Sequence, residues 1–149
     1  MSESLEARIT RMEDLMAIHQ LFIDYGAHLD AGRFDEYGKL FATDGEALMG
    51  PMGRAKGPEA ITALMSGILG DKVGNTYHII SSPRVDLDGD AAHSEVMWSV
   101  VTKMPDGSAS LTAVGRHVDD LVKENGAWRF KKRRGYVDLP NVMPDINKP

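Results

Sequence analysis

The side chains best suited to acid–base chemistry are two imidazoles, His78 and His117, and a carboxylate, Asp30, far from both along the chain. Imidazole titrates nearest to neutral pH, so His78 is the best candidate for a general base. Asp30 lies in the last turn of an expected long helix, where the helix dipole disfavours a carboxylate. Two explanations stay open: Asp30 ends the helix and pairs with Arg33 at the surface, or it points into a pocket and orients a base.

The same residue types could also bind a metal. The conceivable ligands are His78, His117, Glu95 and Asp30. These residues lack the short spacings that are typical of zinc ligands. The chain has no cysteine, which excludes thiol catalysis and cysteine-ligated zinc or iron–sulfur sites. We therefore expect no metal and no cofactor, and His117 is either a pocket residue or the partner of Glu95 in a cross-strand charge pair.

Helices are expected to position Asp30. From about Ser4 to Asp30 the apolar residues recur at the helical period and form one stripe. Tyr25 lies at the centre of that stripe and Asp30 on its flank, which is compatible with the rim of a pocket. A short second helix is expected over residues 34–41, and a third opens at Gly57-Pro58 and closes near Gly70.

Strands are expected to position the histidines, because from Asn75 onward the apolar residues alternate with polar ones. Hairpin signals at Asp88-Gly89, Pro105-Asp106-Gly107 and Asn125-Gly126 divide this part into strands. The expected strands are Thr76–Leu87, Ala91–Met104, Ser108–Lys123 and Ala127–Val137, with an edge strand at Ala47–Met52. Helices followed by an antiparallel meander predict an α+β fold.

The loop lengths predict which residues share a face of this sheet. A two-residue loop at Asp88-Gly89 pairs Leu87 with Asp90, and the later loops extend the register across the sheet. One face is then expected to carry His78, Ile80, Ser82, Glu95, Met97, Ser99, Ala113, Gly115, His117 and Arg134. The other face is expected to carry Ile79, Val96, Trp98, Val100, Val114 and Val118. Because this second face is hydrophobic, we expect a homo-oligomer, a dimer or trimer, packed through the face that carries Trp98.

Length and composition limit the class of protein. A chain of 149 residues fits one domain, with an expected core over about residues 5–138 and a tail over 139–149. The net charge of −5 argues against a nucleic-acid partner, which needs a basic face to neutralise phosphates. No apolar run is long enough to span a membrane and the acidic start is not a signal peptide, so we expect a cytoplasmic protein.

Several motifs together resemble a known family. They are a long helix with YxxxxD near its end, LFATDG, Gly-Pro-Glu at a helix start, T-Y-H in a strand, LDGD, and the final GRHVDDLVKENGAWRFKKRR. In this order and spacing they resemble the SnoaL-like branch of the NTF2-like superfamily over nearly the whole chain. Members of that branch include scytalone dehydratase and hexachlorocyclohexane dehydrochlorinase.

The resemblance implies a cone-shaped α+β barrel, with a curved antiparallel sheet wrapped around N-terminal helices and a deep apolar cavity. It implies a catalytic dyad of a carboxylate and a histidine, which by position are Asp30 and His78. His117 matches an asparagine of the dehydratase pocket. Further candidate substrate contacts are Tyr25, Met49, Met97 and Arg134. Three polar groups of the dehydratase, two tyrosines and a second histidine, are replaced here by Leu29, Met49 and Val101.

The function expected from this resemblance is that of a cofactor-independent lyase or isomerase. It would act on a hydrophobic, aromatic or polycyclic small molecule by proton abstraction, with loss of water or halide or with carbon–carbon cleavage. The alternative is a non-catalytic binder of small apolar ligands, or an accessory protein of the same fold.

Overall fold

A computed structural model describes residues 2–140 of the chain. The helices are α1 (Leu5–Asp30), α2 (Phe34–Gly38) and α3 (Pro58–Leu69), with short 3₁₀ turns at Gly50–Met52 and Gly70–Lys72. The strands are β1 (Phe41–Leu48), β2 (Arg54–Lys56), β3 (Thr76–Asp88), β4 (Ala91–Lys103), β5 (Ala109–Glu124) and β6 (Ala127–Leu139). The four long strands begin and end within two residues of the bounds predicted from the hairpin signals. The predicted tail lies mostly outside the described residues.

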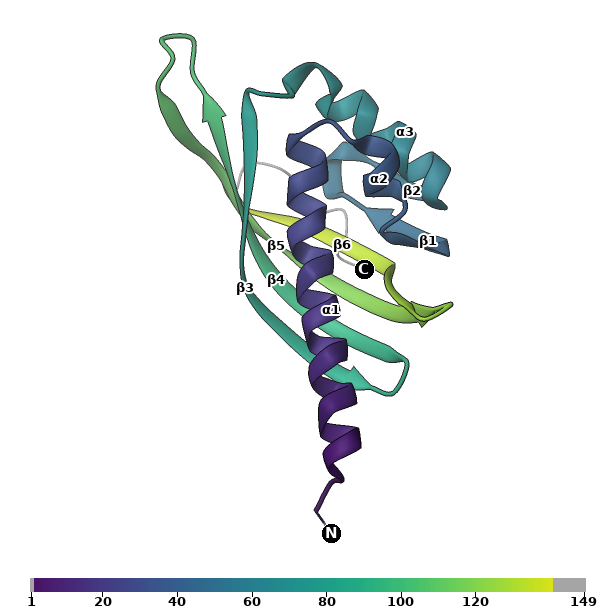
Figure 1. The fold of residues 1–149 in the computed structure, drawn as a ribbon. Helices are drawn as coiled ribbons and strands as arrows, with labels where there is room; N and C mark the ends of the chain where they lie inside the picture. The colour runs from purple at the N-terminus through teal and green to yellow at the C-terminus, as the bar shows by residue number, and fades with distance from the viewer. Residues whose placement is uncertain (1, 141–149) are drawn as a thin grey trace.

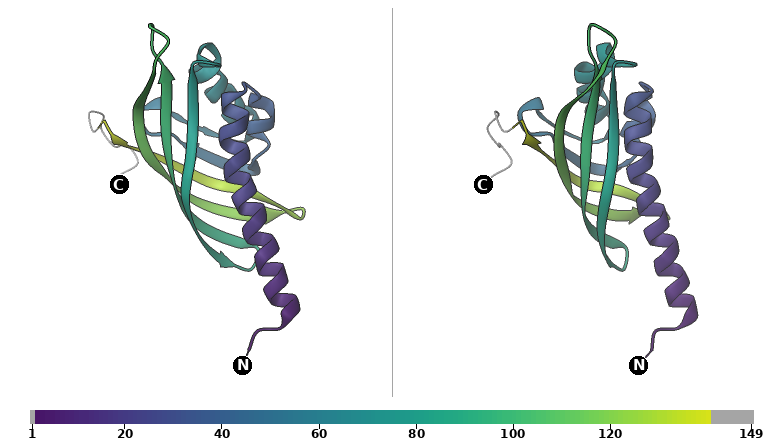
Figure 2. Two further views of the ribbon diagram at one scale, coloured as in Figure 1. Left: turned by 60° about the vertical axis from the view of Figure 1, so that its left-hand side comes forward. Right: turned by 90° about the vertical axis from the view of Figure 1, so that its left-hand side faces the viewer.

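The strands form one curved sheet of six, in the order β2-β1-β6-β5-β4-β3, that does not close on itself. Neighbouring strands are antiparallel except for β1 and β6, which run parallel. Figures 1 and 2 show α1 lying across one face of the curved sheet, with α3 beside its C-terminal end. The predicted α+β class and curved sheet are confirmed, and the parallel β1–β6 pair corrects the expectation of a wholly antiparallel sheet.

Helix α1 brings Asp30 to the sheet. Its N-terminus is capped by the Ser4 hydroxyl, which accepts a hydrogen bond of 3.1 Å from the Ala7 backbone N–H. The C-terminal half packs against β3, and Gly26 permits the close approach, because a Cβ there would lie 3.2 Å from Ile80 Cγ1. Only the first turns of α1 project beyond the sheet (Figure 1). The end of α1 therefore lies beside the beginning of β3, where His78 stands.

The segment between α2 and α3 differs from the prediction. The predicted helix over residues 34–41 stops at Gly38, and β1 begins at Phe41 instead of at Ala47. Gly45 lies inside the strand, at an irregularity in its pairing with β6. A Cβ on Gly45 would lie 2.9 Å from the carbonyl oxygens of Ala42 and Phe130, so only glycine fits this close backbone approach.

The predicted registers of the three long hairpins are wrong, and in the centre of the sheet each is shifted by one residue. At the first hairpin, Gly89 takes the first central position of the turn with φ 60°, so Asp88 pairs with Ala91 instead of Leu87 with Asp90. The other two turns form as predicted, but bulges within the strands then shift the pairing. The inner face consequently carries the even-numbered residues of β4 and the odd-numbered residues of central β6, the reverse of the prediction.

An aromatic core fills the space between α1 and the sheet. Tyr25 contacts three other rings edge to face, with centroids 5.1 Å from Tyr37, 5.1 Å from His117 and 6.0 Å from Phe130. All four side chains are buried. This cluster fixes Tyr25 and His117 relative to each other.

None of the helices in the described part of the chain is long and apolar enough to cross a membrane.

Candidate active site

A cavity of about 370 Å³ lies between the inner face of the sheet and helix α3. Its lining is mainly apolar and comes from α1, α3 and the four long strands. Among the lining residues are Tyr25, Met49, Met65, Ile68, His78, Trp98, Val100, Ala113, His117, Gly135 and Val137. The volume lies within the range of about 300–1,000 Å³ that is usual for small-molecule sites.

Asp30 and His78 meet at the wall of this cavity. The Asp30 Oδ1 atom lies 2.7 Å from His78 Nδ1, and the two side chains are 19% and 13% exposed. The His78 backbone N–H also donates to both carboxylate oxygens, at 3.0 Å and 3.1 Å. Arg33, the alternative partner, bonds to His28 instead. The structure therefore supports the second explanation of Asp30, which orients an imidazole at a pocket.

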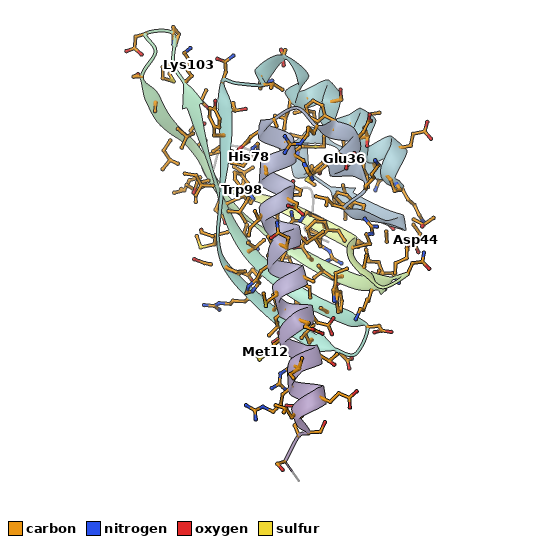
Figure 3. The ribbon with its side chains drawn as sticks, viewed as in Figure 1. Met12, Glu36, Asp44, His78, Trp98 and Lys103 are labelled. Carbon is orange, nitrogen blue, oxygen red and sulfur yellow. The ribbon has the colours of Figure 1, made fainter. Side chains whose placement is uncertain are left out.

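This contact determines the tautomer of His78. An ionised Asp30 only accepts hydrogen bonds, so the imidazole places its proton on Nδ1 and donates it. The Nε2 atom is then left with a free lone pair, and no described residue makes a hydrogen bond to it. His78 lines the cavity, on β3 next to Trp98 of β4 (Figure 3). A ring held by a carboxylate in this way has the geometry that a general base needs.

His117 is buried on the same face, 5% exposed. Burial lowers the pKa of His117 well below its ordinary value, and the nearby charge of Arg133 lowers it further. The ring is therefore neutral at pH 7 and can act as a hydrogen-bond partner, not as a cation. Burial also raises the pKa of Tyr25, which keeps its hydroxyl protonated.

A buried ion pair lies deeper in the fold, behind Tyr25. Arg133 donates from Nε and one terminal nitrogen to the Asp119 carboxylate at 2.8 Å and 2.9 Å, and both side chains are almost fully buried. The guanidinium carbon lies 4.2 Å from the Tyr25 ring centroid and 3.9 Å from that of Phe130. The pair neutralises its own charge and supports the Tyr25 ring from behind.

The structure brings together some of the predicted site residues and separates others. Tyr25, Met49 and His117 line the cavity with His78. Two of the predicted substrate contacts do not. Met97 is 45% exposed on the outer face, and Arg134 bonds to Asp120 there at 3.2 Å.

The shifted registers explain these differences. Glu95 shares the outer face with Met97, so the conceivable ligand set with His78 and His117 is not assembled. Trp98, expected on the exposed face, points inward and is 8% exposed. The outer face therefore does not carry Trp98 and presents Ile79, Met97 and Leu111 instead. An oligomer packed through the outer face stays a prediction. Trp98 was missed as a cavity residue because its face depends on the position of the first hairpin turn and on bulges in the neighbouring strands.

Comparison with known proteins agrees with this architecture. A family model described as the SnoaL-like domain matches residues 10–134. An uncharacterized protein of Mycobacterium tuberculosis is 28% identical over 130 residues, which cover 84% of this chain and 86% of the relative.

Two solved structures are also similar. An NTF2-like protein with a cystatin-like fold from Novosphingobium aromaticivorans has a TM-score of 0.86 at 24% identity, over 93% of this chain and 90% of that one. A proposed scytalone dehydratase from the same organism has a TM-score of 0.79 at 23% identity, over 95% and 99% of the two chains. At these identities the two likenesses bear on the fold alone.

Proposed function

Since this chain belongs to the SnoaL-like family, we propose that it is a cofactor-independent lyase or isomerase that removes a proton from a carbon atom of an apolar, aromatic or polycyclic molecule. One observation supports the proposal above all others. A histidine ring, held by a carboxylate at 2.7 Å, stands in the wall of an apolar cavity. The similarity to a proposed scytalone dehydratase is consistent with a reaction of this class.

In the proposed mechanism the neutral His78 ring is the base. Its Nε2 lone pair takes a proton from a carbon next to an electron-withdrawing group, so that the C–H bond breaks and an N–H bond forms. Asp30, bonded to Nδ1, stabilises the imidazolium that results. The electron pair forms a new double bond as a leaving group, such as hydroxide or halide, departs. The same proton can instead be returned at another carbon, which gives an isomerisation.

The surroundings of the dyad suit this chemistry. The cavity walls are mainly apolar and the pair is mostly buried, which strengthens the Asp30–His78 interaction relative to its strength in solution. Neutral hydrogen-bond donors near the base, the Tyr25 hydroxyl and the His117 ring, can stabilise charge that develops on the substrate. Binding then depends on apolar contact, and the reaction depends on the dyad.

A second function has one observation in its favour. Asp30 accepts from the His78 backbone N–H as well as from the ring, so the contact would tie α1 to β3 even in a protein without catalysis. A non-catalytic binder of small apolar ligands would retain this tie.

Kinetics separates the two functions. Aromatic alcohols, halides and ketones would be screened for turnover, and the best substrate tested with His78→Gln and Asp30→Asn. Loss of the base or of its orienting charge is expected to lower kcat by about 10²- to 10⁴-fold, while the dissociation constant for the substrate changes little. Asp24→Asn, on the same helix and bonded to Gln20, is the matched control. Equal loss of binding and turnover, or no turnover of any compound, would favour the binder.

A further inference from the structure

Helix α1 carries a second line of apolar side chains, which faces solvent. Its buried side chains lie in the core, and they include Ile18, Leu21, Phe22, Tyr25 and Leu29. Roughly 150° around the helix axis from these lies another line, which we call the exposed stripe. Its members are each 47–70% exposed, and they are Leu5, Ile9, Met12, Met16 and Ile23. A surface helix is normally polar on its solvent side, so α1 has an apolar face that its own chain does not cover.

The exposed stripe is open to a partner along its length. At 1.5 Å per residue it runs about 27 Å from Leu5 to Ile23. In the right-hand view of Figure 2, α1 forms the edge of the molecule, and no described element lies beyond it. The outer face of the sheet, which carries Met97, lies on the other side of the molecule. The stripe and the outer face are therefore separate surfaces.

The spacing of the stripe is that of a helix that pairs with another helix. From Leu5 its members follow at steps of four, three, four and seven residues, and His19 divides the last step into three and four. Alternating steps of three and four are the heptad pattern of a coiled coil, whose helices meet along a narrow seam. Position a of the heptad holds Ile9, Met16 and Ile23, and position d holds Leu5, Met12 and His19. Isoleucine at a with leucine at d favours two parallel strands.

The charges beside the seam favour a second copy of this chain as the partner. Arg8 lies at heptad position g and Glu13 at position e. Both are exposed, and neither makes an ion pair within the described part of the chain. In a parallel pair, position g of one helix faces position e of the next heptad in the other helix, so Arg8 meets Glu13 of the second copy, once on each side of the seam. In the antiparallel register that superposes the two stripes, Glu13 would face Glu13 of the second copy.

The size and charge of the surface agree with this partner. Two paired stripes would remove on the order of 1,000 Å² from water, near the lower limit for a specific interface. A two-fold axis closes after two copies, so the contact makes a dimer. An anionic membrane surface is a poorer match, because the first 14 residues contain four acidic and two basic side chains.

We propose that α1 pairs in parallel with α1 of a second copy of this chain, through the exposed stripe and two Arg8–Glu13 ion pairs. His19 is then the polar residue of the seam, and a polar side chain at one seam position lowers the stability of such a pair. The dimer does not rest on the proposed function, because the stripe lies on the side of α1 that faces away from the cavity.

Disulfide cross-linking tests the orientation. The chain has no cysteine, so a single introduced thiol reports on one position. Met12→Cys brings two thiols together at position d of the parallel pair and is expected to cross-link under mild oxidation. In the antiparallel register the two thiols would lie about 6 Å apart along the axis, too far for a disulfide between facing helices. Ala17→Cys, exposed on the same helix but outside the stripe, is the matched control. Equal cross-linking of the two variants would overturn the proposal.

Analytical ultracentrifugation over about 1–300 µM measures the dissociation constant of the dimer. Met16→Lys is expected to weaken the dimer by more than about 10-fold, and Ala17→Lys, its neighbour outside the stripe, should leave it unchanged. His19→Leu fills the seam and is expected to strengthen the dimer by about 3- to 10-fold, a gain that a folding defect would not produce.

A charge exchange tests the ion pairs. Arg8→Glu is expected to weaken the dimer by about 3- to 10-fold, and adding Glu13→Arg to it should restore the affinity. Met97→Lys, on the outer face of the sheet, should leave the α1 contact intact. A dimer that Met97→Lys dissociates and Met16→Lys does not would overturn the proposal. A wild type that stays monomeric would overturn it too, whether or not the protein binds phosphatidylglycerol vesicles.

Discussion

Replacement of Asp119 by asparagine leaves the buried guanidinium of Arg133 without its counter-charge. The two side chains are 1% and 0% exposed and share hydrogen bonds of 2.8 Å and 2.9 Å. Removing one partner of such a pair costs about 3–5 kcal/mol, because the remaining charge stays buried and uncompensated. For a chain of this length each kcal/mol shifts the Tm by about 2–4 °C, so Asp119→Asn is expected to lower the Tm by about 6–20 °C.

The matched comparison removes both charges. Arg133→Met combined with Asp119→Leu replaces the pair by apolar side chains, and most of the lost stability should return. About 1 kcal/mol is expected to stay missing, because the Ser94 hydroxyl donates to Asp119 at 3.1 Å and loses this acceptor. Urea denaturation followed by circular dichroism measures the wild type and both variants. The reasoning fails if Asp119→Asn costs less than about 1 kcal/mol, or if the double variant is no more stable than Asp119→Asn.

Three further predictions concern the packing at Gly115, the neutral His117 and the outer face. Gly115→Ala would place its methyl group 2.0 Å from the Tyr136 carbonyl oxygen and is expected to lower the free energy of unfolding by about 1–3 kcal/mol. The control Gly67→Ala has no atom within 4 Å of its new methyl group and should not lower it. Equal urea midpoints for the two variants would contradict this prediction. Because the pKa of His117 is lowered in the folded state, the unfolded state binds the extra proton, so the free energy of unfolding should fall by up to about 1.4 kcal/mol per pH unit below the ordinary histidine pKa of 6.5. Denaturation at several pH values should show a shallower fall in His117→Asn; a wild-type slope in His117→Asn would show that another group titrates. Finally, a homo-oligomer through the outer face should dissociate in Met97→Lys, as measured by light scattering, and a monomeric wild type would contradict it.

Much of the fold could be predicted because its signals are local. The apolar stripe of α1 and the Gly57-Pro58 start of α3 predict helices, and these form. The Asn125-Gly126 turn forms as predicted, with both residues at positive φ, 52° and 79°. Hairpin ends could be located to within two residues for the same reason.

The faces of the strands could not be predicted, because they depend on bulges. A bulge adds one unpaired residue and exchanges the two faces beyond it. The bulges in β5 and β6 lie near Thr112 and Lys131, where no turn residue marks them. The irregularity in β3 does have a signal, since Pro83 cannot donate to a strand ladder and Ser82 before it has φ 52°.

The candidate site could be predicted only in part, because it is formed by residues that are far apart along the chain. Asp30 and His78 are 48 residues apart, and only the family resemblance paired them. A one-residue shift in β6 put Arg134 in the expected pocket, whereas the inward-pointing arginine is Arg133, already paired with Asp119. A one-residue shift in the pairing of β3 with β4 likewise placed Trp98 on the wrong face in the prediction. The alternating pattern of a strand divides its residues into two sets on opposite faces, and the bulges decide which set faces inward.

The central claim is that Asp30 holds a neutral His78 with its proton on Nδ1 and a bare Nε2 toward the cavity. The ¹⁵N chemical shifts of the His78 ring, measured in solution with the ring neutral, test it without a substrate. The account predicts a protonated Nδ1 and an unprotonated Nε2 in the wild type, and a mixture of tautomers in Asp30→Asn. A wild-type ring with its proton on Nε2, or one unaffected by Asp30→Asn, would contradict it.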